Sequence, residues 1–203
     1  MVFVDLLTSQ LFALGFAGLL VAYLFISTYL RLRRGRKVDE SIRSAVIPIA
    51  LLGAYLFVTG LFGQFTWPLP GSYNILFYDL LALTGLLLIA FAWAARRGDE
   101  THNVGFLALL LGLLTIYYGY EGYTLGLSQS PIALLSLYSL LGIAGVLAYP
   151  STLVLDAIRN GAKKLDALHV AVVGLFVLAV IAGSLMAIVI AGMALPVHLV
   201  TPP

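Results

Sequence analysis

Six long apolar segments restrict the folds open to this chain more than any other feature of the sequence. They run over about Leu6–Leu30, Ala45–Phe65, Tyr73–Ala95, Asn103–Tyr120, Pro131–Leu155 and Leu168–Leu195. A helix of roughly 20 residues crosses a hydrocarbon layer about 30 Å thick. Because unpaired backbone groups are costly in lipid, segments of this length are expected to be helical. The sequence therefore predicts an all-α, multi-pass protein of the cell membrane, with six transmembrane helices in one domain, residues 1–203.

Charged residues are scarce, and the basic ones are confined to three connections. Asp, Glu, Lys and Arg make up 10% of the 203 residues, whereas roughly 25% is usual in a soluble domain. All eleven basic residues follow the first, third or fifth apolar segment: Arg31, Arg33, Arg34, Arg36, Lys37, Arg43, Arg96, Arg97, Arg159, Lys163 and Lys164. The positive-inside rule makes that side cytoplasmic and places both termini outside. Topology accounts for these charges, so the lipid bilayer is expected as a partner and nucleic acid is not.

Short similar stretches recur along the chain and indicate an internal repeat. Arg33-Arg34-Gly35 is echoed by Arg96-Arg97-Gly98 and by Arg159-Asn160-Gly161, and Tyr78-Asp79-Leu80-Leu81 aligns with Tyr138-Ser139-Leu140-Leu141. The simplest interpretation is three helix hairpins, residues 1–66, 67–126 and 127–203, related by an axis along the membrane normal. The alternative is chance, because leucine and small residues recur in any membrane bundle.

Asp79 is the ionisable residue that most strongly suggests function. It lies about six residues inside the third apolar segment, which places it roughly 9 Å below the outer helix end. Ionisable groups at such depth are costly and usually face a bundle interior or a wet cavity. No Lys or Arg is expected on this half of the protein to pair with it.

The outer half holds further polar residues that are candidates for a common site with Asp79. They are Glu121, Gln64, Asn74, Tyr73 and Tyr78. One hypothesis is that this set forms an outward-opening site for a cation or a proton. The other is that Asp79 is protonated and satisfied by tyrosine and amide hydrogen bonds, in which case its role is packing. His198, in the expected outer tail, is a further possible partner.

The cytoplasmic side carries two Asp-x-x-His pairs, Asp99 with His102 and Asp166 with His169. Residues three apart share one face of a helix, so each pair can cooperate. Two such pairs are compatible with a metal, with a haem held between histidines, or with a proton relay. The simpler interpretation is that acidic residues near helix N-termini complement the helix dipole. No further ligand is evident, so no cofactor is assigned.

Two prolines lie within the apolar segments. Pro150 is expected inside the fifth helix, where it removes a backbone hydrogen bond, whereas Pro48 is expected in the first turn of the second helix. The chain contains no nucleotide-binding glycine loop, zincin motif or nucleophile elbow. It also contains no cysteine, which excludes disulfides and cysteine nucleophiles. Nothing in the sequence argues for an enzyme.

The segment from Trp67 to Ile75, followed by Tyr78 and Asp79, is similar to the distinctive region of a membrane protein family named domain of unknown function 981. The resemblance implies membership over most of the chain and an archaeal-type cell membrane protein. It carries no established activity, so it transfers no catalytic residue.

The leading functional hypothesis is a small transporter or channel-like protein with an outward carboxylate site. The alternative is an accessory subunit of a larger membrane complex, for example a respiratory one, in which Asp79 and the tyrosines contact a partner. A homo-oligomer is compatible with either. A transporter of this kind predicts a polar cavity that reaches Asp79 from outside, whereas a subunit predicts a closed bundle.

Overall fold

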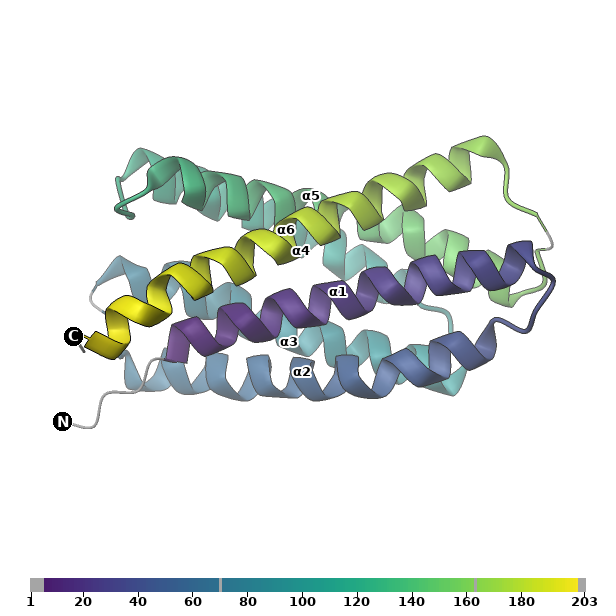
Figure 1. Ribbon diagram of the computed structural model, residues 1–203, viewed down its shortest axis with the longest axis horizontal. Coiled ribbons are helices and arrows are strands. Elements are labelled where there is room, and N and C mark those ends of the chain that lie inside the picture. The colour runs from purple at the N-terminus through teal and green to yellow at the C-terminus, as the bar shows by residue number, and fades with distance from the viewer. Residues whose placement is uncertain (1–5, 70, 163, 201–203) are drawn as a thin grey trace.

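The computed structural model describes residues 6–69, 71–162 and 164–200, apart from the side chains at 197 and 198. Six helices fill the described ranges: α1 (Leu6–Arg33), α2 (Asp39–Thr66), α3 (Ser72–Arg97), α4 (His102–Thr124), α5 (Pro131–Arg159) and α6 (Ala167–Val200) (Figure 1). Each is long and apolar enough to cross a membrane. The predicted all-α architecture with six spans is confirmed.

Most helices extend beyond the apolar segments that predicted them, because their polar ends continue the helix. α1, α3 and α5 end at Arg33, Arg97 and Arg159. Cations in the last turn interact favourably with the negative end of the helix dipole. The basic residues therefore support the helix ends in addition to marking one side of the membrane.

Two expectations about helix boundaries are wrong. α2 begins at Asp39, so Pro48 lies inside the helix rather than in its first turn. The segment from Pro196 to Val200, expected as a tail, continues α6. Pro150 lies inside α5 as predicted. Pro70 and Lys163, which belong to the predicted outer turn and basic connection, lie outside the described residues, as does the side chain of His198.

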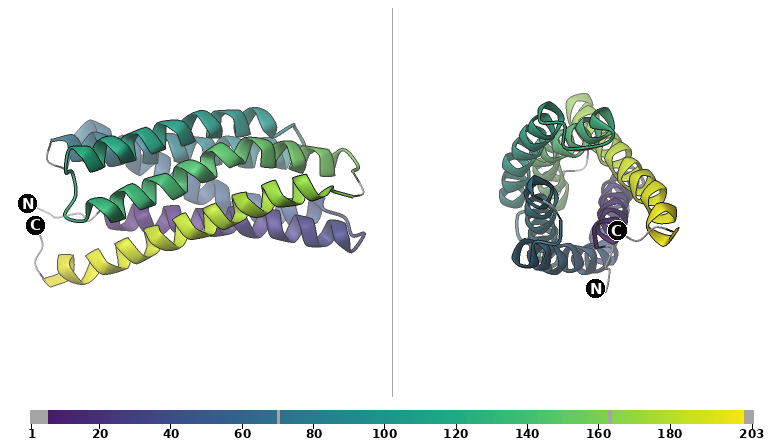
Figure 2. Two further views of the ribbon diagram at one scale, coloured as in Figure 1. Left: turned by 90° about the horizontal axis from the view of Figure 1, so that it is seen from above. Right: turned by 90° about the vertical axis from the view of Figure 1, so that its left-hand side faces the viewer.

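The six helices form a ring in chain order. Each contacts the next along the chain, and α6 returns to contact α1, as the end-on view in Figure 2 shows. We call the end with the connections 34–38, 98–101 and 160–166 the basic end. The end with the turns 67–71 and 125–130 is the aromatic end, where α1 begins and α6 finishes (Figure 1).

Glycines bring α2 against α3 and α4 against α5 at very short range. A methyl group added at Gly85 of α3 would meet the backbone nitrogen of Phe57 at 2.3 Å. One added at Gly112 of α4 would meet the carbonyl oxygen of Gly142 on α5 at 2.5 Å. Such backbone contact replaces the hydrophobic driving force that lipid cannot supply. These two pairs have the most extensive contact in the ring.

The predicted hairpin repeats, residues 1–66, 67–126 and 127–203, stay a prediction. The two most extensively packed neighbours, α2 with α3 and α4 with α5, are joined through turns at the aromatic end. Each of these pairs therefore crosses a boundary between two predicted repeats. The contact between α3 and α4, which belong to one predicted repeat, is the smallest between neighbours in the ring.

Candidate functional site

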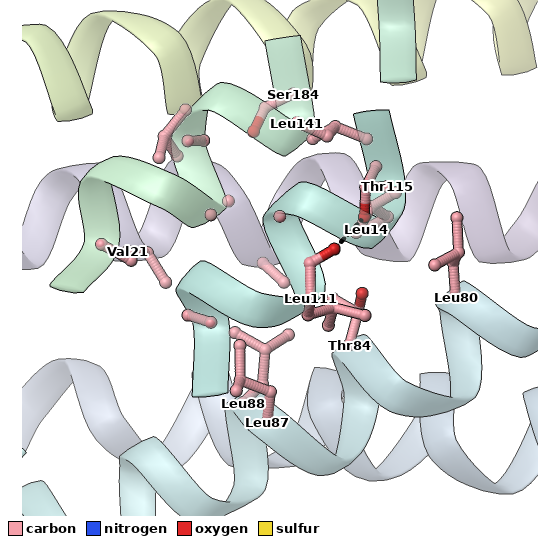
Figure 3. Close-up of a pocket in the computed structure, with 18 of the residues that line it drawn as sticks. Leu14, Val21, Leu80, Thr84, Leu87, Leu88, Leu111, Thr115, Leu141 and Ser184 are labelled. Atoms are coloured by element: carbon pink, nitrogen blue, oxygen red, sulfur yellow. Dashed lines mark hydrogen bonds between the residues drawn. The ribbon is translucent and has the colours of Figure 1, made fainter. Parts of the chain in front are cut away.

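An elongated cavity lies inside the ring of helices. Its volume is about 190 Å³, and its walls come from α1, α3, α4, α5 and α6. On α4 the lining runs from Val104 to Thr115, a rise of about 16 Å along the helix axis. The labelled wall residues in Figure 3 include Leu14 and Val21 of α1, Leu80, Leu87 and Leu88 of α3, and Leu111 of α4. The cavity is therefore an internal space bounded mainly by leucine, valine and alanine side chains.

Hydroxyl groups are the polar side-chain groups of the cavity wall. They belong to Thr84, Thr115, Tyr138, Thr152 and Ser184. Three of them already donate to backbone carbonyls: Thr115 to Leu111 at 2.7 Å, Thr152 to Tyr149 at 2.8 Å, and Tyr138 to Leu76 at 2.7 Å. Ser184 is 1% exposed, and its Oγ has no hydrogen-bond partner among the described residues. Among the described residues that line the cavity, none is charged.

Asp79 joins three helices near the aromatic end. Gln64 of α2 donates from Nε2 to its Oδ1 at 3.0 Å, and Tyr118 of α4 donates from its hydroxyl to Oδ2 at 3.1 Å. All three side chains are partly buried. The predicted proximity of Gln64 and a tyrosine to Asp79 is therefore present, although Tyr118 was not among the tyrosines expected there.

Asp79 faces away from the cavity. Residues four apart lie on one stripe of a helix, and the neighbours of Asp79 on that stripe, Ile75 and Leu83, are both 44% exposed. The cavity is instead lined by Leu80, Leu81 and Thr84. Asp79 therefore lies on the outer flank of the bundle and is not among the residues that line this cavity.

The other predicted members of the outer site are dispersed around this flank. Asn74, 1% exposed, donates from Nδ2 to the Gly63 carbonyl at 3.1 Å and accepts from the Leu69 amide at 3.3 Å, so it fixes the turn between α2 and α3. Tyr78 is buried, and its ring fills the space beside Gly63. Tyr73 and Glu121 are partly exposed. The contacts of the described residues do not join either of them to Asp79.

A second polar cluster lies at the basic end, around Asp156 of α5. This buried carboxyl group accepts the Thr101 amide at 2.9 Å on each oxygen, the Thr101 hydroxyl at 2.8 Å and the His102 amide at 2.9 Å. Amides at a helix N-terminus have no partner within their own helix. Asp156 therefore caps α4 from the neighbouring helix.

Arg159, one turn further along α5, binds the same connection. It donates to the Asp99 carbonyl at 2.9 Å and to the Ala95 carbonyl at 3.3 Å. The Ala95 carbonyl belongs to the last turn of α3, where carbonyls lack partners within the helix. Asp156 and Arg159 thus fasten both sides of the α3–α4 connection to α5.

Of the two predicted Asp-x-x-His pairs, Asp166 with His169 forms in the structure, whereas Asp99 and His102 bind other partners. Asp99 forms an exposed ion pair with Arg97, Oδ2 to Nε 3.1 Å, while His102 Nδ1 lies 3.1 Å from Asp156 Oδ2. Asp166 does pair with His169: it accepts the His169 amide at 2.8 Å and lies 2.5 Å from its Nδ1. The bond from the His169 amide lowers the pKa of Asp166. Among the described residues no group of three or more possible metal ligands occurs.

Three residues of these polar groups were not predicted from the sequence: Asp156, Tyr118 and Ser184. The role of Asp156 could have been predicted from its position. A carboxylate in the last turn of a helix opposes the helix dipole and so requires a partner elsewhere. Tyr118 is one of several tyrosines near the aromatic end, and no pattern distinguishes it. Ser184 is a lone hydroxyl in the most apolar segment, where a polar residue is unusual.

The fold and its polar clusters define a polytopic membrane protein built as a single six-helix ring. The chain belongs to the DUF981 family: the model described as Protein of unknown function (DUF981) matches residues 1–201. The resemblance carried by the Trp67–Asp79 region is thus confirmed over nearly the whole chain. Neither the curated proteins nor the solved structures include a match to this sequence.

Proposed function

We propose that this protein is a membrane-embedded binding protein, of carrier or transporter type, for a small uncharged molecule held inside the helix ring. The observation that supports this proposal is the cavity of about 190 Å³. An apolar cavity of about 150 Å³ in a protein core stays dry and takes up benzene. The cavity here is therefore large enough for an organic molecule somewhat larger than one aromatic ring.

The cavity wall favours an uncharged guest over an ion. Its side chains are apolar apart from hydroxyl groups, and the described lining contains no carboxylate or ammonium group. A charge in such surroundings loses its hydration without compensation. The interior site proposed here therefore differs from the outward carboxylate site for a cation or a proton that was the leading hypothesis from the sequence.

The seam between α3 and α4 offers a route between the cavity and the lipid. Both helices line the cavity, and their mutual contact is the smallest between neighbours in the ring. The hydrogen bond from Tyr118 to Asp79 crosses this seam near the aromatic end. A guest that dissolves in lipid can then enter from the side without crossing an aqueous phase.

Photolabelling with a small hydrocarbon diazirine tests the proposal. In phosphatidylcholine nanodiscs we expect the probe to insert into cavity residues such as Leu111 and Leu141, and also into lipid-facing residues such as Leu185, which is 50% exposed. Replacing Leu14 by tryptophan adds a large ring to the cavity wall, as does Thr84→Phe. Either substitution should reduce insertion into Leu111 and Leu141 about tenfold and leave Leu185 unchanged, as measured by peptide mass spectrometry.

Two controls test whether a loss of labelling comes from filling the cavity. Ile132→Trp places a similar ring at a residue that is 73% exposed and does not line the cavity, so it should leave cavity labelling as in the wild type. Helical content and elution volume are compared for all variants. Labelling confined to lipid-facing residues in the wild type, or cavity labelling that both filling variants leave intact, contradicts the proposal.

A second candidate function is supported by Asp79 itself. Its carboxyl group lies within a membrane-spanning helix, and its hydrogen-bond partners, Gln64 and Tyr118, are both neutral. Intramembrane carboxylates without a basic partner often exchange protons or bind cations. Because Asp79 faces away from the cavity, this site on the outer flank would operate separately from the proposed interior site.

Ion uptake into proteoliposomes tests this second candidate. With a proton gradient or a sodium gradient imposed, the wild type is expected to show uptake that Asp79→Asn reduces at least tenfold, because the amide cannot ionise. Glu121→Gln, a neutralised carboxylate on the next turn after Tyr118, is the matched control and should retain uptake. Equal uptake by wild type, Asp79→Asn and protein-free vesicles would exclude the Asp79 site.

A further inference from the structure

The cavity wall contains one buried hydroxyl group that nothing in the described structure satisfies. Ser184 lies midway along α6, is 1% exposed and lines the cavity. Its Oγ has no hydrogen-bond partner among the described residues. Figure 3 shows Ser184 on the wall of the cavity across from Thr84. A buried polar group without a partner is costly, and native proteins rarely retain one.

The part of α1 that packs against Ser184 offers this hydroxyl no side-chain hydrogen-bond partner. A methyl group added at Gly18 of α1 would lie 2.0 Å from Ser184 Oγ, so the oxygen occupies the space that a side chain at that position would fill. Gly18 also lines the cavity. α1 therefore presents a glycine to this oxygen, and a glycine Cα–H is at best a weak hydrogen-bond donor.

Three of the other four hydroxyls of the wall differ from Ser184 in having hydrogen-bond partners. Thr115 and Thr152 donate to carbonyls of their own helices, and Tyr138 donates to a carbonyl of α3. Each of these is satisfied within the protein. The fourth, Thr84 of α3, makes no side-chain hydrogen bond among the described residues, but it is partly exposed, on the opposite wall.

We infer that the molecule held in the cavity is amphiphilic, with one neutral hydrogen-bonding group that binds Ser184. This inference rests on the proposed function and specifies the class of ligand. A serine hydroxyl both donates and accepts, so an alcohol, a phenol or a ketone fits, whereas a pure hydrocarbon leaves the oxygen unpaired. The remaining wall requires that the rest of the molecule be apolar.

The test compares two photoprobes of equal chain length, a six-carbon diazirine alcohol and the corresponding diazirine hydrocarbon, in phosphatidylcholine nanodiscs. Insertion into Leu111 and Leu141 is divided by insertion into lipid-facing Leu185, which corrects for partitioning. One neutral hydrogen bond corresponds to about a three- to tenfold preference. We expect the wild type to favour the alcohol by this factor, and Ser184→Ala to abolish the preference.

Thr115→Val is the matched control, since it removes a cavity hydroxyl that already has a partner. It should keep the preference for the alcohol. If both probes label the cavity equally in the wild type, or if Ser184→Ala keeps the preference, the inference is wrong while the binding function stands. If neither probe labels Leu111 or Leu141 although Leu185 is labelled, the proposed function fails and the inference with it.

Discussion

Replacing Gly112 by alanine is expected to destabilise the helix ring by about 2–3 kcal/mol. The added methyl group would meet three backbone atoms of α5 at under 3.0 Å: the Gly142 oxygen, the Val146 nitrogen and the Gly145 carbonyl carbon. Backbone atoms cannot rotate away as a side chain can, so α4 and α5 must separate. Overpacking of this kind costs about 1–3 kcal/mol, and α4 and α5 form one of the two most extensive contacts in the ring.

The chain provides a matched control for this substitution. Gly174 also lies within a helix, and a methyl group added there has no neighbour within 4 Å. Gly174→Ala is therefore expected to leave stability unchanged or to raise it by up to about 1 kcal/mol through helix propensity. Unfolding by sodium dodecyl sulfate in mixed micelles, followed by tryptophan fluorescence, measures both variants. Equal unfolding midpoints for Gly112→Ala and Gly174→Ala would refute the close packing of α4 on α5.

Replacing Asp156 by alanine is expected to lower the free energy of unfolding by about 3–5 kcal/mol. The substitution leaves the amides of Thr101 and His102 and the hydroxyl of Thr101 without their acceptor. Hydrogen bonds to charged groups contribute about 1.5–3 kcal/mol each, and buried donors that lose a partner add a desolvation cost. Asp156→Asn keeps one carbonyl oxygen and should fall between alanine and the wild type.

Asp99→Ala is the control for this series. Asp99 is an aspartate of the same connection, but its side chain is 55% exposed and pairs only with Arg97 among the described residues. Exposed ion pairs contribute between zero and about 1 kcal/mol. The same detergent titration applies to all variants. If Asp156→Ala unfolds within 1 kcal/mol of Asp99→Ala, the capping role assigned to Asp156 is wrong.

The six membrane spans were predictable because each is recognised from the apolar composition of a long stretch of sequence. A run of about 20 apolar residues has few alternatives to a transmembrane helix. The helix ends were less predictable, since polar residues such as Asp39 and Arg159 extend a helix into the interface without an apolar signal. This is why Pro48 was placed in a first turn although it lies inside α2.

The depth of Asp79 could be inferred from the sequence, but its direction could not. Depth follows from the position along the helix, at about 1.5 Å per residue. Direction depends on which face the neighbouring helices cover, and the weakly amphipathic α3 gives little indication of that. Ile75 and Leu83 are as apolar as the cavity-lining Leu80 and Leu81, yet the first two are exposed and the second two are buried.

Asp156 shows a second limit of prediction from sequence, which concerns contacts between residues that lie far apart in the chain. Its partner, Thr101, lies 55 residues away in the chain, and no spacing rule relates two positions on neighbouring helices. Sequence proximity instead suggested a pairing of Asp99 with His102. In the structure, His102 lies beside the carboxyl group of Asp156.

α3 and α4 are connected differently at their two ends. This difference bears on which leaflet of the bilayer can exchange molecules with the interior of the protein. At the basic end the two helices are joined covalently through residues 98–101, and Asp156 and Arg159 tie that connection to α5. Near the aromatic end, the bond between Asp79 and Tyr118 bridges them. Separation of the two helices would therefore pivot at the basic end and widen toward the aromatic end. Such a hinge would open the interior to one leaflet and keep it closed to the other.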